Sequence, residues 1–107
     1  MANTFKSSGV KLSSTTATNL YSVPVSTTAV VKSVYVANIH VSATATIDVY
    51  YTRSSVDYYI IKGATVPVST TLQVVTESLV LQASDVLKVK ASAADRLDCT
   101  ASYLEIT

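Results

Sequence analysis

The chain has 107 residues, of which 49% are apolar and 14% are charged, and its formal net charge is +1. This length predicts a single domain, and the near-zero charge without a basic cluster argues against nucleic acid or an anionic membrane as a partner. The one cysteine, Cys99, excludes an intramolecular disulfide and a cysteine zinc site. Because no signal-like start and no apolar run of about 18 residues are visible, we expect a soluble protein made in a cytoplasm.

The first 13 residues differ from the rest in having few large apolar side chains apart from Phe5. We therefore expect residues 1–13 to form an N-terminal arm or extended segment, of the kind that often reaches a neighbouring molecule. The remaining residues, 14–107, are expected to form one β-sandwich domain.

The domain is rich in Thr, Val, Ile and Tyr, which favour strands over helices. Apolar and polar residues alternate most clearly at 44–51 and 86–91. Weaker patterns predict further strands at 18–23, 28–38, 57–61, 71–75, 78–82 and 97–106. Residues 91–95 are interpreted as a loop. We therefore predict an all-β chain with a single antiparallel β-sandwich of about eight strands, jelly-roll-like in arrangement.

The hexapeptide Val-Pro-Val-Ser-Thr-Thr occurs twice, at 23–28 and at 66–71. Proline cannot donate to a β-ladder and marks a strand end, while the hydroxyl residues favour a turn. Each copy is therefore predicted to be a strand–turn–strand corner. Because the flanking residues differ, repeated turn chemistry is favoured over a duplicated half-domain or a ligand-binding motif. The segment 83–85 predicts a third turn, interpreted as a hairpin.

Four tyrosines flank the predicted hairpin loop at 52–57: Tyr50, Tyr51, Tyr58 and Tyr59. On two paired strands they place aromatic rings on both faces at the same level. One face is expected to belong to the core, and the other to expose tyrosine at a protein interface, which tyrosine favours. Core or strand-pairing aromatics and a carbohydrate platform are the alternatives. Phe5 is the second predicted interface anchor.

The chain shows no pattern of residues for catalysis or metal binding. His40 is the only histidine, and alternation alone cannot bring it together with a nucleophile and an acid. The carboxylates lack the close spacing of a calcium loop, and 95–98 is interpreted as a solvated loop with an ion pair. Cys99 is interpreted as a small buried apolar residue. We predict no catalytic residue, no metal site, no cofactor and no enzymatic activity.

Three stretches carry a family resemblance: MANTFKSSGV at the start, LYSVPVSTTAVVKSVYVANI in the middle and LKVKASAADRLDCTASYLEIT at the end. They resemble small virion structural proteins of tailed bacteriophages, including phages of marine and cyanobacterial hosts, over nearly the whole chain. Where that family usually has Ala-Gly after Val-Pro, this chain has Val-Ser, at 25–26 and 68–69. The departure concerns the type of turn and leaves the corner itself in place.

The resemblance implies a non-enzymatic β-sandwich component of the virion, either a capsid decoration (cement) protein or a neck or tail surface protein. Its partners would be other virion proteins, and it would reside in the virion after synthesis in the host cytoplasm. The modest core and the candidate anchors further predict a homo-oligomer, since cyclic assembly is the commonest way to bury such surface. The alternative function is a host-adhesion or carbohydrate-binding module.

Overall fold

The computed structural model describes residues 3–75 and 77–107, and this part of the chain contains nine strands and no helix. The strands are β1 (Asn3–Lys11), β2 (Thr18–Ser22), β3 (Thr28–Asn38), β4 (Ala45–Arg53), β5 (Val56–Val66), β6 (Thr71–Val75), β7 (Leu79–Leu81), β8 (Val86–Ala91) and β9 (Leu97–Ile106). Each of the eight predicted strands has a counterpart, and β1 is the addition. The predicted all-β architecture is confirmed.

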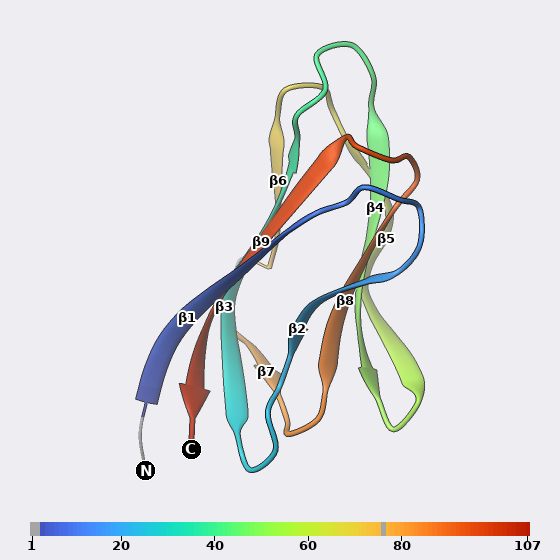
Figure 1. Cartoon of the computed structure of the whole chain (residues 1–107). Coiled ribbons are helices and arrows are strands. Elements are labelled where there is room, and N and C mark those ends of the chain that lie inside the picture. The colour runs from blue at the N-terminus through green and yellow to red at the C-terminus, as the bar shows by residue number, and fades with distance from the viewer. Residues whose placement is uncertain (1–2, 76) are drawn as a thin grey trace.

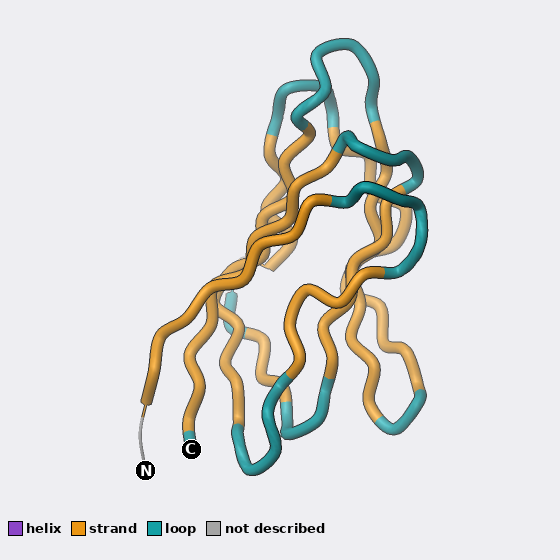
Figure 2. Tube along the Cα trace, viewed as in Figure 1, coloured by secondary structure: helices purple, strands orange, loops and turns teal. Residues whose placement is uncertain are grey.

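Two antiparallel sheets face each other, with the loops gathered at the two ends (Figures 1 and 2). The β9 sheet has the strand order β1-β9-β3-β6, with β7 also paired to β3, and the β8 sheet has the order β2-β8-β4-β5. Only the β4–β5 and β6–β7 connections stay within one sheet, and every other connection crosses between the sheets. This is a jelly-roll arrangement, so the predicted sandwich is confirmed.

The core lies between the sheets and follows the two-residue period of the strands. In β9 every odd-numbered side chain is buried: Leu97, Cys99, Ala101, Tyr103 and Glu105. In β8 the predicted alternation is also present, with Leu87, Val89 and Ala91 buried. Because opposite residues of paired strands share a face, the even-numbered residues of β9 and their partners form the outer face of the β9 sheet.

The two Val-Pro-Val-Ser-Thr-Thr copies occupy equivalent places in the fold. Residues 23–28 join β2 to β3 and residues 66–71 join β5 to β6, so each copy carries the chain from the β8 sheet to the β9 sheet. Ser26 and Ser69 stand at the same position of the motif and have φ values of 57° and 54°. The same local turn is therefore used twice, and the predicted corners are confirmed.

The turn at 83–85 does not form the predicted hairpin. It joins β7 in the β9 sheet to β8 in the β8 sheet, so the hairpin prediction is wrong. The Asp85 carboxylate accepts the backbone N–H of Gln82 at 2.8 Å and three hydrogen bonds from Nε and Nη2 of Arg53, the shortest at 2.6 Å. This turn is held by a side chain of β4 rather than by pairing of the strands that it joins.

The N-terminal segment 1–13, expected to be an arm or extended segment, contains β1. The nine residues of β1 pair with β9 without any shift in register, so they lie along the sandwich as an edge strand. Lys6 and Ser8 lie opposite Tyr103 and Ala101 and share their face. Because these positions are polar, the apolar alternation that marks the other strands is missing from β1.

The two-residue turn of the β4–β5 hairpin generates a stability prediction. Ser54 and Ser55 have φ values of 52° and 64°, a conformation in which a type I′ turn favours Asn-Gly. We expect Ser54→Asn combined with Ser55→Gly to raise the free energy of unfolding by about 1 kcal/mol, measured by urea denaturation. As a control, Ser22→Gly in the extended strand β2 should lower it. An unchanged or less stable turn variant would contradict the assignment.

Candidate protein-contact surfaces

The β4–β5 hairpin arranges the four predicted tyrosines as two cross-strand pairs. The ring centroids of Tyr50 and Tyr59 are 4.7 Å apart, and those of Tyr51 and Tyr58 are 5.2 Å apart. Tyr58 and Tyr59 are each 47% exposed, whereas Tyr50 is only 6% exposed and Tyr51 is half-buried. The exposed part of this surface therefore comes from β5, the edge strand of the β8 sheet.

The pairing between β4 and β5 is irregular beside Tyr50. Tyr50 does not belong to the core cluster. The register of β4 against β5 shifts between Val49 and Tyr50. A second irregularity lies near Gly63, whose φ is 68° and whose N–H donates to Asp48 Oδ1 at 2.7 Å. Burial raises the pKa of Tyr50. Alternation predicts the outward direction of this ring but not the residues that cover it.

On the core side of the hairpin, Tyr51 packs against the core and against a cation. The guanidinium carbon of Arg53 lies 5.2 Å from the ring centroid of Tyr51. Arg53 also donates from Nε and Nη2 to the carboxylate of Asp85, and these hydrogen bonds hold the pKa of Asp85 below its usual value. Tyr51 is thus a packing residue, and Tyr58 is its exposed partner.

A second surface lies on the outer face of the β9 sheet. Cross-strand pairing places Phe5 opposite Leu104, Leu104 opposite Val30, and Val30 opposite Val80. This outer apolar row (Phe5, Leu104, Val30 and Val80) crosses four strands. Phe5 is 76% exposed and Val80 is 55% exposed, while the two middle residues are half-buried. Sequence reasoning identified only Phe5, because finding the others requires the register between strands.

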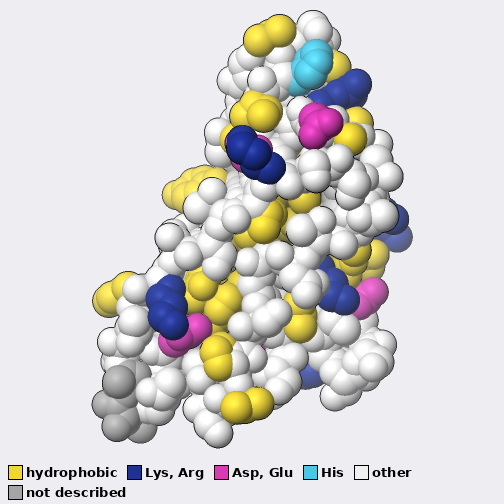
Figure 3. Space-filling model, in the orientation of Figure 1, with side chains coloured by type: hydrophobic (Ala, Val, Ile, Leu, Met, Phe, Trp, Pro, Cys, Tyr) yellow, Lys and Arg dark blue, Asp and Glu magenta, His cyan; other side chains and the backbone are white. Residues whose placement is uncertain are grey.

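The structure does not bring Phe5 together with the tyrosines. β1 is the edge of the β9 sheet beside β2, whereas β5 is the opposite edge of the β8 sheet beside β6 (Figure 1). In the space-filling view, backbone atoms and side chains that are neither hydrophobic nor charged cover most of the visible face, and charged side chains are few and scattered (Figure 3). The predicted anchors therefore belong to two separate surfaces.

A polar cluster around the buried Glu105 connects β1 to β2 and β9, and sequence reasoning did not predict it. The hydroxyl of Tyr21 on β2 donates to Glu105 Oε2 at 2.6 Å, and Lys6 Nζ lies 2.9 Å from Glu105 Oε1. The rings of Tyr21 and Tyr103 stack at 3.7 Å, and the Tyr103 and Ser8 hydroxyls are 2.8 Å apart. The hydrogen bond from Tyr21, followed by that from Lys6, lowers the pKa of Glu105. The alternation of β9 places Glu105 on the inward face, and this was the sequence signal that could have identified the cluster.

The remaining candidate residues have structural surroundings. His40 lies in the β3–β4 loop, where Nδ1 accepts the backbone N–H of Ala43 at 3.0 Å. Cys99 is buried as predicted, and burial raises the pKa of its thiol to about 12. Asp98 pairs with Lys11 at 3.0 Å.

Within residues 3–75 and 77–107, no group of three or more acidic, histidine or cysteine side chains is placed to hold a metal. The same described ranges contain no helix with the length and apolar character needed to cross a membrane.

The buried carboxylate generates a pH prediction. Because the folded-state pKa of Glu105 is below the unfolded value of about 4.3, its stabilising effect is complete at neutral pH and is lost as pH falls through the folded pKa. We expect Tyr21→Phe to lose less stability than the native chain between neutral pH and about pH 3, measured by urea denaturation. The control Tyr103→Phe keeps the bond between Tyr21 and Glu105 and should retain the native pH dependence. Identical pH dependence in Tyr21→Phe and the native chain would refute the assignment.

No family model and no curated protein matches this sequence. Among solved structures, the chain is similar to a chain in the structure of infectious bursal disease virus Gt strain, with 12% sequence identity and a TM-score of 0.47. The similarity covers 98% of this chain and 30% of that chain. A likeness of this size carries no functional conclusion.

Proposed function

We propose that this chain is a non-enzymatic accessory structural component of a tailed-phage virion. It acts through protein–protein contacts as a capsid decoration (cement) protein or as a neck or tail surface protein. The observation that carries the proposal is the outer apolar row on the β9 sheet, where Phe5 and Val80 are exposed at either end.

The surroundings of this row suit contact with another protein. On the same face, Ser7 and Ser102 are cross-strand neighbours, and so are Ser102 and Ser33. A partner that covers the row and these serines removes hydroxyl groups and apolar side chains from water, which costs less than burying unpaired charges. Phenylalanine is also enriched at protein interfaces relative to other surfaces.

The resemblance to tailed-phage virion proteins supports the same proposal, because it extends over nearly the whole chain. The jelly roll is compatible with such a role but does not select it, since one fold serves many functions. Two hollows on the described residues measure about 200 and 70 Å³, and each is smaller than the roughly 300–1,000 Å³ of ordinary ligand pockets.

The proposal predicts that the chain is a stoichiometric part of purified particles. Quantitative mass spectrometry of virions from the phage that encodes it should detect the chain at a fixed ratio to the major capsid protein. Particles that lack the chain, or contain it at a variable trace level, would overturn the virion role.

A binding experiment tests the surface itself. Purified chain carrying Val80→Lys should bind poorly to particles from which the chain has been deleted, because a buried lysine without a partner is costly. Val25→Lys is the matched control, since Val25 is 76% exposed but lies in the β2–β3 corner and is not a member of the row. Equal loss of binding in both variants would remove the row as the contact surface.

A host-adhesion or carbohydrate-binding role is favoured by one observation, the half-exposed rings of Tyr58 and Tyr59 at the β5 edge. Against it, Tyr59 already packs on Tyr50 and lies 5.0 Å from Lys62 Nζ, which leaves less free ring face for a sugar. We expect no specific signal on a glycan array. A signal that disappears in Tyr59→Ala but persists in Phe5→Ala would make adhesion the better assignment.

A further inference from the structure

The free edge of β1 is the most regular strand edge of the molecule. β1 pairs with β9 on one side over nine residues without a register shift, and no other described strand pairs with it. The other edge strands are irregular or short: β2, β5 and β6 have register shifts, and β7 has three residues. β1 also contains no proline. A long, regular edge of this kind is a template for pairing with another strand.

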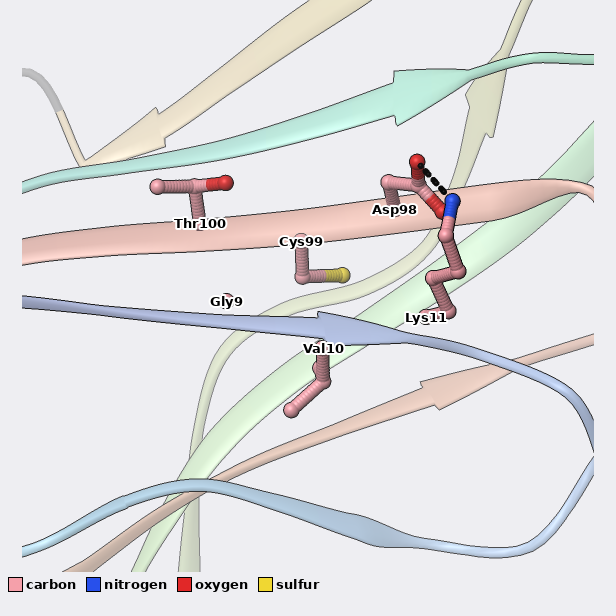
Figure 4. Close-up of a pocket in the computed structure, with 6 residues that line it drawn as sticks. All are labelled: Gly9, Val10, Lys11, Asp98, Cys99 and Thr100. Atoms are coloured by element: carbon pink, nitrogen blue, oxygen red, sulfur yellow. Dashed lines mark hydrogen bonds and ion pairs between the residues drawn. The ribbon is translucent and has the colours of Figure 1, made fainter.

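The outer face of β1 carries a projecting side chain and a hollow. Phe5 projects from this face, and Gly9 lies four residues further along the same face. A shallow hollow of about 200 Å³ lies over Gly9 and is lined by Val10, Lys11, Asp98, Cys99 and Thr100 in addition. In Figure 4, Thr100 and Asp98 project from one side of β9 and Cys99 from the other, and Lys11 reaches Asp98 from the strand that carries Gly9.

Nothing within the chain requires glycine at position 9. Its φ is not positive, so the backbone there is open to other residues. A Cβ atom built on Gly9 would lie 3.7 Å from the Cys99 carbonyl oxygen and 3.9 Å from Thr100 Oγ1, which are ordinary contacts. The effect of the glycine is therefore to keep the hollow open toward the outside.

We infer that two copies of this chain pair through their β1 edges in antiparallel fashion, with Ser7 on the two-fold axis. In this register Phe5 of each copy lies opposite Gly9 of the other and fills its hollow. Aromatic side chains across from glycine are a known way to stabilise paired strands. The inference deepens the proposed assembly role by naming one partner, a second copy of the chain.

The register is selective. A two-fold axis perpendicular to the sheet pairs residues of the same face, so the axis must pass through a residue. An axis at Lys6 would place Phe5 opposite Ser7, and an axis at Ser8 would place it opposite Lys11. With the axis at Ser7, Lys6 lies opposite Ser8 and Lys11 opposite Asn3, so no like charges meet. Only this register joins the side chain to the hollow.

The joined β9 sheets would form one continuous sheet with an outer apolar row on each side of the axis. Strand pairing of nine residues gives a smaller contact than the roughly 800 Å² per partner of a standard stable interface. We therefore expect a dimer whose population rises with protein concentration, measured by sedimentation equilibrium on the purified chain.

Cysteine cross-linking tests the axis directly. Ser7 is exposed, and Ser7→Cys would place two thiols opposite each other at a Cα separation of about 4.5–5.5 Å, within disulfide range. The native Cys99 is buried and does not compete. In the control Asn3→Cys, each new cysteine lies opposite Lys11 of the other copy, eight residues away from that copy's own cysteine. The two thiols would therefore be about 26 Å apart. Mild oxidation should cross-link Ser7→Cys in large excess over Asn3→Cys, and equal yields would overturn the register.

A swap of the two residues gives a second test. Phe5→Gly should weaken dimerisation roughly tenfold, because both symmetric contacts are lost. Combining Phe5→Gly with Gly9→Phe restores an aromatic residue opposite glycine and should recover the dimer, while Val80→Ser should leave it unchanged. A native chain that is monomeric at all concentrations, or a swap without recovery, refutes the pairing. Virion composition is measured independently, so either proposal can fail without the other.

Discussion

The buried carboxylate of Glu105 is the interaction on which the N-terminal side of the sandwich depends. A charge at an inward position needs hydrogen-bond donors, because burial without them is costly. Tyr21 of β2 and Lys6 of β1 supply them, so one side chain of β9 links the two sheets and the edge strand. β1 offers little apolar surface of its own, and its position rests on this link together with its backbone pairing to β9. Because Phe5 precedes Lys6 on β1, the same contacts fix the position of Phe5 on the outer face of the sheet.

Local pattern was sufficient to predict the strands of the domain and insufficient to predict how they are joined. Alternation identifies β4 and β8 because an apolar core face repeats every second residue. It misses β1, whose inward residues include Lys6 and Ser8 and suit a polar cluster instead. The turn ending at Asp85 has ordinary turn chemistry, which specifies a change of direction but not which sheet receives the next strand.

The candidate surfaces were predictable to a similar degree. Phe5 stands out as the only phenylalanine of the chain, and the hairpin tyrosines stand out because four of the seven tyrosines flank one loop. The low exposure of Tyr50, whose ring packs on Tyr59 across the hairpin, is not revealed by periodicity. Val30 and Val80 join Phe5 only through the register of four strands. The two candidate surfaces lie on separate edges of the sandwich, so contacts proposed at one would leave the other accessible.

The pairing of the first strand with the last also affects how the chain is made. β1 spans residues 3–11 and its partner β9 spans 97–106, so at ordinary translation rates roughly 5 to 20 s separate their synthesis. During that interval the ribosome carries a nascent chain whose first segment has no partner within it. Neighbouring nascent chains on one messenger RNA would meet with these segments still open, and exchange of the first strand between them is the characteristic error of such a topology.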